Sequence, residues 1–193
     1  GINLQPIYTK NDLENLEFIK ALPGFDNFVR GFSPCGYHKN TWNVNQEIKI
    51  ADANEFNSAL QLALGNGQNC VNLSLDSATK LGLDADYADE SLVGDNGLSI
   101  SAIKSLERAL KNIDLTKNEI SICTGKNVLP FLSLFNAYLK SQNIESKKII
   151  GNISADPINE LIKIGNVNVS EDFLFNSLKL AIDWAKTNSP NLK

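Results

Sequence analysis

The chain has 193 residues, of which 42% are hydrophobic and 21% charged, enough to bury a core as a soluble globular domain or part of one. Its formal net charge of −4, without a cluster of Lys or Arg, excludes the electrostatic footprint of a nucleic-acid-binding protein. No apolar stretch approaches the roughly 20 residues that a membrane span needs, so neither nucleic acid nor a membrane is an expected partner.

Cysteine and histidine are too sparse to build a metal centre or a redox pair. Cys35, Cys70 and Cys123 are widely spaced and form neither a zinc-binding spacing nor a CxxC pair. His38 is the sole histidine, and it lies in a loop-like stretch without a nucleophile signature beside it. We therefore expect free thiols in a reducing cytoplasm, and no metal site.

The first 50 residues differ in character from the rest. Turn-forming residues recur there without sustained apolar periodicity, at Pro6, Pro23-Gly24, Gly31 and Pro34. This pattern predicts an extended N-terminal arm over residues 1–50, and not an independent domain.

From residue 51 onward the pattern becomes regular. Asp52 is placed to cap a first helix, and Gly65-Asn66-Gly67 ends it. Because these glycines follow a predicted helix and not a strand, they predict a C-cap and not a phosphate loop. Strands are predicted at 70–75, 97–100, 119–123 and 148–154. Further helices are predicted from a cap at Ser101, over 128–140, from Asp156-Pro157, and from a cap at Ser170 to about 186.

Strands that alternate with helices predict a parallel sheet with right-handed crossovers. Within these strands, apolar residues alternate with small polar ones, which are Asn72, Ser74, Ser121, Asn152 and Ser154. The apolar face is expected to meet the helices. The polar face suits a hydrated barrel lumen, because a packed TIM barrel fills its lumen with Val, Ile and Leu. The predicted fold is α/β, with four βα units over 51–193 that form about half of a TIM barrel.

The predicted helix 128–140 is apolar on nearly every side, broken by Pro130, Ser133 and Asn136. An outer barrel helix that faces water has a polar stripe instead. Its second apolar face therefore needs a cover, for which the N-terminal arm, the last helix and another subunit are all candidates.

Three collinear segments carry a resemblance to a known family. They are residues 1–12; Leu22-Pro23-Gly24 with Phe28-Val29-Arg30-Gly31, Trp42 and Gln46; and 75–79 with Gly82, Asp84 and Gly94-Asp95-Asn96-Gly97. In order and spacing they resemble the methylmalonyl-CoA mutase family. The resemblance implies a TIM barrel through which coenzyme A threads along the axis, capped by a cobalamin-binding domain.

At the positions that the family uses to hold coenzyme A, this chain departs from the pattern. The resemblance places two phosphate-binding arginines at Asn40 and Asn45, and a substrate-packing tyrosine at Glu47. Asparagine lacks the charged fork that holds a phosphate, and a glutamate repels one.

The fourth predicted strand and the segment after it depart from the pattern as well. The family's threonine and glutamine on this strand are Asn152 and Ser154, and a downstream arginine is Ile164, whereas Ser121 keeps the family's residue type. The family's substrate-polarising histidine comes after a fifth strand, which is expected to lie beyond Lys193. The cobalamin-binding domain is expected to be absent.

The retained scaffold and the substituted site predict the non-catalytic small (beta) subunit of a cobalamin-dependent methylmalonyl-CoA mutase. On this interpretation the large subunit, holding adenosylcobalamin, interconverts methylmalonyl-CoA and succinyl-CoA. This chain then has no catalytic, substrate-binding, cofactor or metal residues, and pairs with the large subunit as a heterodimer; in isolation it forms a homodimer. The alternatives are a divergent acyl-CoA mutase fragment with another thioester substrate, and an unrelated α/β binding module.

Overall fold

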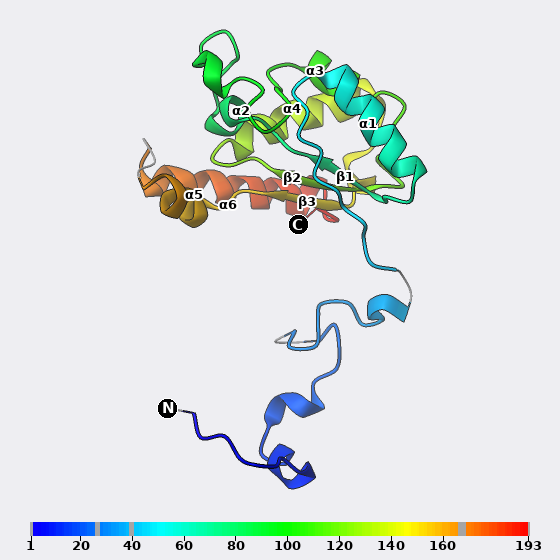
Figure 1. Ribbon diagram of the computed structural model, residues 1–193, viewed down its shortest axis with the longest axis vertical. Helices are drawn as coiled ribbons and strands as arrows, with labels where there is room; N and C mark the ends of the chain where they lie inside the picture. The colour runs from blue at the N-terminus through cyan, green and yellow to red at the C-terminus, as the bar shows by residue number, and fades with distance from the viewer. Residues whose placement is uncertain (1, 26–27, 39–40, 166–168, 193) are drawn as a thin grey trace. The chain divides into compact units, whose positions relative to one another are not determined.

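The computed structural model describes residues 2–25, 28–38, 41–165 and 169–192 of the chain. The chain divides into two compact units, Gly1–Trp42 and Asn43–Lys193 (Figure 1). None of the helices that the described residues form is long and apolar enough to cross a membrane.

In the first unit, the residues that the structure describes form three short 3-10 helices, which are η1 (Lys10–Leu13), η2 (Glu17–Lys20) and η3 (Gly36–His38). η1 begins with a capping box, in which the backbone N–H of Thr9 donates to Asp12 at 2.6 Å. This bond and a second from the Thr9 hydroxyl lower the pKa of Asp12. No described side chain of the unit is buried, so its described residues form no core of their own.

The second unit is built on a three-stranded parallel sheet in the order β1-β2-β3. The strands are β1 (Cys70–Leu73), β2 (Glu119–Cys123) and β3 (Gly151–Ser154). Asn72, Ser121 and Asn152 are register partners across the three strands, as are Leu73, Ile122 and Ile153. The predicted α/β fold, a parallel sheet of the partial (βα)-barrel type, is confirmed.

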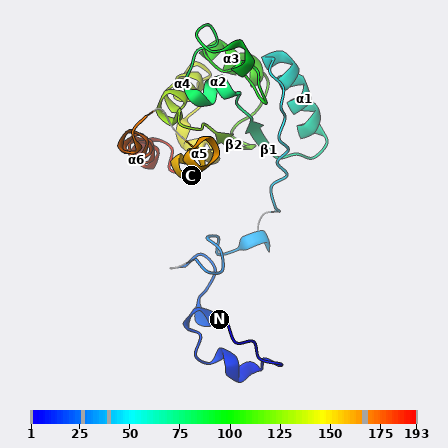
Figure 2. The same cartoon turned by 60° about the vertical axis from the view of Figure 1, so that its left-hand side comes forward.

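The described residues form six α-helices beside the sheet: α1 (Ala53–Gly65), α2 (Ser77–Leu81), α3 (Ile103–Ala109), α4 (Val128–Ser141), α5 (Pro157–Ile164) and α6 (Glu171–Asn188). Two further 3-10 helices are η4 (Glu90–Leu92) and η5 (Ser146–Lys148). The contacts run from α1 to α3, from α3 to α4 and from α4 to α6, so these helices succeed one another in an arc around the strands (Figure 2). Asp52 and Ser170 cap α1 and α6 as predicted. α5 begins at Pro157 as predicted, and Asp156 caps it.

The core lies between the apolar face of the sheet and this arc of helices. Val71, Leu73, Ile120 and Ile122 are each at most 1% exposed. They pack in one cluster with aromatic and aliphatic side chains from the helices, including Phe56, Leu106, Phe131 and Phe135. Because this interior side is dry and apolar, the small polar residues of the strands are left to the opposite face, as the alternation predicts.

The prediction of a strand at 97–100 is wrong, so the described residues form three strands and not four. Leu98 makes only an isolated parallel bridge, in which its N–H donates to Ser74 O at 2.7 Å and its carbonyl accepts from Asp76 N at 3.1 Å. The chain passes so close to β1 that a Cβ at Gly97 would lie 2.3 Å from Ser74 O.

Two helix starts also differ from the prediction. The residue at the N-cap of α3 is Ala102, and no side-chain hydrogen bond caps the helix, so Ser101 does not act as its cap. The short helix α2 was not predicted, although Asp76 caps it by accepting from Thr79 N at 2.8 Å.

The second apolar face of α4 is covered, at least in part, by α6. Val128 and Leu132 of α4 form a buried cluster with Ala181 of α6, and Leu129 and Trp184 pack against it. The last helix is therefore one of the covers that the sequence required.

Candidate functional site

The candidate site is the polar face of the sheet, defined by Asn72, Ser74, Ser121, Asn152 and Ser154. Ser74 is buried and Asn72 and Ser121 are half-buried, whereas Asn152 and Ser154 on the edge strand β3 are exposed. The face therefore becomes more open from β1 towards β3.

The hydrogen bonds of the polar face leave part of it free for a ligand or a partner. The Ser74 hydroxyl donates to Asn72 Oδ1 at 3.2 Å, and the Ser154 hydroxyl donates to the Ile122 carbonyl at 3.3 Å. The side chains of Ser121 and Asn152 make no hydrogen bond within the part of the chain that the structure describes. These two neighbours in register supply donors and acceptors but no charge.

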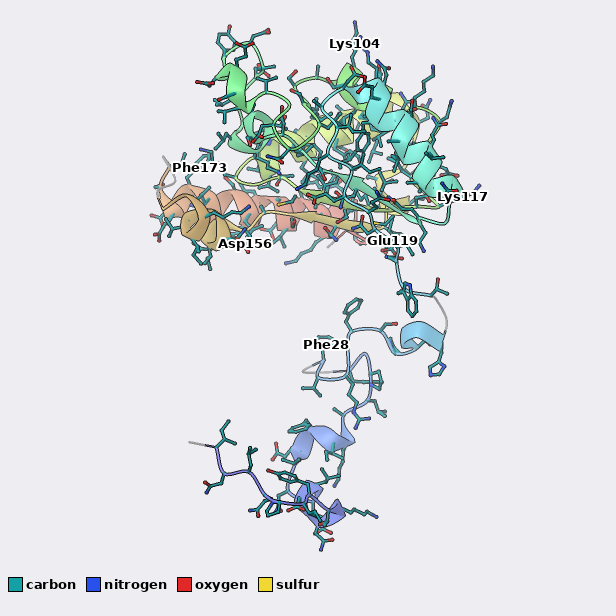
Figure 3. All side chains as sticks on the ribbon, in the orientation of Figure 1. Phe28, Lys104, Lys117, Glu119, Asp156 and Phe173 are labelled. Carbon is teal, nitrogen blue, oxygen red and sulfur yellow. The ribbon has the colours of Figure 1, made fainter. Side chains whose placement is uncertain are left out.

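The amino end of this face carries a carboxylate. Glu119 opens β2 and shares the face of Ser121, since the two are two positions apart on one strand. Its Oε2 accepts from the side-chain amide of Asn43 at 2.6 Å. Burial, reinforced by the Glu119 charge, raises the pKa of the neighbouring Cys70 thiol to about 11. Figure 3 labels Glu119 at this end and Asp156 just beyond the other.

The segment that contains Asn45 and Glu47 is held at the same end of the sheet. Besides the Asn43 bond, Val44 N donates to Asn69 Oδ1 at 2.7 Å, and the Val44 carbonyl accepts from Asn69 N at 3.2 Å. Asn45 is exposed and makes no hydrogen bond with any other described residue. Glu47 is exposed and pairs with Lys49 at 3.4 Å, beside a hollow of about 510 Å³ along α1.

Of the remaining substituted positions, the structure describes two in full. Asn152 and Ser154 lie on one face of β3, as predicted. Asn40 lies outside the described residues, and Ile164 ends α5 with its side chain outside them as well. The structure thus brings Asn45 and Glu47 to the amino end of the sheet, and places Asn152 and Ser154 on its polar face.

The carboxyl end of the sheet contains a buried polar network that sequence reasoning missed. Asp76 is fully buried and accepts from Thr79 N at 2.8 Å and from Gly94 N at 2.8 Å. Thr79 Oγ1 in turn accepts from Ile100 N at 3.0 Å. Because each carboxylate oxygen of Asp76 is engaged by a backbone amide, this network shapes the loops and leaves no free base. Its sequence signal was the polar run directly after β1.

The described residues contain no group of three or more His, Cys, Asp or Glu side chains that could hold a metal ion. The site offers a strip of polar, uncharged side chains that crosses one face of the sheet, with carboxylates at its amino end. Such a strip can hydrogen-bond an extended polar molecule, but nothing described on it supplies a nucleophile with its base.

A parallel sheet with helices on its apolar face and small polar side chains on the other is the arrangement of part of a (βα) barrel. The chain belongs to the methylmalonyl-CoA mutase family, whose model matches residues 1–193.

Curated relatives agree with this assignment. The chain is 30% identical over 163 residues to the methylmalonyl-CoA mutase of Escherichia coli (strain K12), covering 84% of this chain and 23% of that protein. It is 29% identical over 163 residues to the mutase of Rhizobium meliloti (strain 1021), again covering 84% of this chain and 23% of the relative. It is 28% identical over 193 residues to the methylmalonyl-CoA mutase large subunit of Porphyromonas gingivalis (strain ATCC BAA-308 / W83), covering 98% of this chain and 27% of that protein. The chain thus spans about a quarter of the length of these relatives.

Proposed function

We propose that this chain is a non-catalytic structural subunit that assembles with a large catalytic subunit of methylmalonyl-CoA mutase. The large subunit holds adenosylcobalamin and interconverts methylmalonyl-CoA and succinyl-CoA, whereas this chain binds neither the cofactor nor the thioester. Three free thiols, Cys35, Cys70 and Cys123, suit a cytoplasmic complex.

One observation carries the proposal. The bond from Asn43 to Glu119 holds the segment with Asn45 and Glu47 against the amino end of the polar face. The family resemblance assigns phosphate-binding arginines to this segment. Here it presents a neutral amide and a carboxylate, and its cation Lys49 is already paired with Glu47.

This charge pattern disfavours coenzyme A. A phosphate needs cationic or multiple N–H donors in a fixed geometry, and the two carboxylates Glu47 and Glu119 add repulsion. The family model nevertheless matches residues 1–193, so we assign the folded surface of this chain a role in assembly with the large subunit.

A reconstitution experiment tests this assignment. The chain is mixed with the large mutase subunit of its own organism, and the complex and its turnover are measured. We expect a one-to-one complex whose turnover is unchanged by Ser121→Ala or Asn152→Ala in this chain. Isomerase activity from this chain without the large subunit would contradict the proposal.

The alternative, a divergent acyl-CoA mutase with another thioester substrate, draws on one observation. Ser121 and Asn152 present hydrogen-bonding groups that no described residue engages, as a ligand-binding lumen would. If Ser121→Ala or Asn152→Ala slows turnover several-fold while the complex still forms, this second function is the correct one.

A further inference from the structure

A second cavity, separate from the polar face, lies between the start of α4 and the first turns of α6. It has a volume of about 500 Å³, within the range of small-molecule sites. Its walls are mostly apolar and include Leu129, Phe173 and Leu180. Phe173, labelled in Figure 3, is 57% exposed and Leu180 is 58% exposed, so an apolar ligand would cover surface that water now contacts.

A few polar groups converge on this apolar cavity. Lys126 lines it, carries the single charge among its described lining residues, and makes no ion pair in the described part of the chain. Beside it begins the 14-residue helix α4, where the backbone N–H groups of Val128 and Leu129 make no hydrogen bond with a described residue. Free N–H groups and the helix dipole favour an anion there.

Ser177 of α6 supplies a further hydrogen-bonding group to the cavity. Its side chain lines the cavity and is only 7% exposed. Its hydroxyl makes no hydrogen bond with a described residue, so it is available to a ligand in the cavity.

The turn that carries Lys126 is fixed from two sides. Thr124 is fully buried, and its N–H and hydroxyl both donate to the Ser154 carbonyl, at 2.9 and 3.1 Å. Asn127 donates its side-chain amide to the Thr79 carbonyl at 2.8 Å. The backbone that carries Lys126 and the helix start are therefore held in place before any ligand arrives, which lowers the entropic cost of binding.

We propose that this cavity binds a small monocarboxylate with an apolar tail. The carboxylate sits at Lys126 and the amino end of α4, and the tail packs against Phe173 and Leu180. Ser177 donates its hydroxyl to the ligand. This site does not depend on the function proposed for the polar face.

The test titrates the full chain with acetate, butyrate, hexanoate and octanoate, followed by calorimetry and by amide shifts in NMR spectra. Affinity is expected to rise about fourfold for each added methylene until the cavity is filled. Lys126→Gln is expected to weaken octanoate binding by about tenfold or more, and Ser177→Ala by a few-fold. Lys140→Gln, at the opposite end of α4, is the matched control and leaves binding unchanged.

Three outcomes overturn the proposal. The first is no saturable octanoate binding below about 10 mM. The second is equal binding of acetate and octanoate, which would indicate a surface ion contact. The third is undiminished octanoate binding by Lys126→Gln, which would indicate apolar adsorption alone. Thermal melts of each variant establish that the chain remains folded.

Discussion

The side-chain amide of Asn43 donates to the carboxylate of Glu119 at 2.6 Å, across 76 positions of sequence. Together with the backbone contacts between Val44 and Asn69, this bond attaches the segment before α1 to the amino end of the sheet. These bonds determine the position of Asn45 and Glu47 relative to the polar face.

Asn43→Ala is expected to lower the free energy of unfolding by about 1 kcal/mol, because it removes a charge-assisted bond at a partly solvated site. Urea denaturation measures the change. Asn54→Ala is the control, since the side chain of Asn54 is exposed in the first turn of α1 and makes no hydrogen bond with a described residue; it should alter stability by less than about 0.5 kcal/mol. Equal effects of the two substitutions would show that the Asn43 bond does not hold the segment.

Gly151→Ala is expected to destabilise the chain by about 3 kcal/mol or more. Gly151 has a φ of +133°, and a Cβ there would lie 2.0 Å from the Ile120 carbonyl oxygen in the centre of the sheet. Gly165→Ala provides the comparison, because its φ is +72° but no atom of the other described residues lies within 4 Å of the added Cβ. Backbone strain alone predicts a cost of about 1 kcal/mol at Gly165, and similar costs at both glycines would refute the close contact.

Sequence patterns predicted some elements of this fold correctly and others wrongly. The alternation around Ser121 and the caps Asp52 and Ser170 were predictable, because strand periodicity and capping depend on near neighbours. The prediction of a strand at 97–100 was wrong. Its apolar residues are buried because they pack in the core beside the end of β1, where Leu98 makes an isolated bridge with Leu75, and not because they form a strand.

The candidate sites were predictable to different degrees. The polar face arises from alternation within single strands, so sequence alone indicated it. The cavity beside α4 joins Lys126 to Ser177, which belong to elements whose contact depends on tertiary packing. No local pattern predicts such a pair.

Alkaline pH is expected to destabilise the chain through Cys70. Burial and the Glu119 charge raise the pKa of its thiol from 9.0 to about 11, so the folded chain holds this proton more tightly than the unfolded chain. The resulting stabilisation is complete below pH 9 and is lost as pH rises towards about 11, by an amount on the order of 1–2 kcal/mol. Burial, reinforced by the Glu107 charge, also raises the pKa of Tyr138 above its ordinary value.

Denaturation of wild type and Cys70→Ser at pH 7 to 11 isolates the cysteine, because Tyr138 contributes to both curves. The wild-type curve should fall more steeply above about pH 9. At pH 8, a thiol reagent should modify the exposed Cys35 and Cys123 rapidly and Cys70 slowly. Parallel stability curves, or three equally fast thiols, would disprove the buried neutral thiol.

The isolated chain is expected to self-associate through apolar side chains exposed on its last two helices, which include Ile158, Ile162, Phe175 and Ile182. Phe175→Gln should weaken this association several-fold, whereas Lys179→Ala on the same helix should not. Sedimentation velocity over a range of concentrations measures it. A 21.2 kDa monomer at every concentration would contradict the prediction.

Calorimetry with coenzyme A and methylmalonyl-CoA tests the central claim most directly. The stretch of the Porphyromonas gingivalis large subunit that aligns with this chain serves as the comparison. For this chain, the neutral Asn45 and the carboxylates Glu47 and Glu119 predict no saturable binding tighter than about 100 μM, equivalent to about −5.5 kcal/mol. One-to-one binding of either ligand with a dissociation constant below about 100 μM would contradict a non-catalytic role.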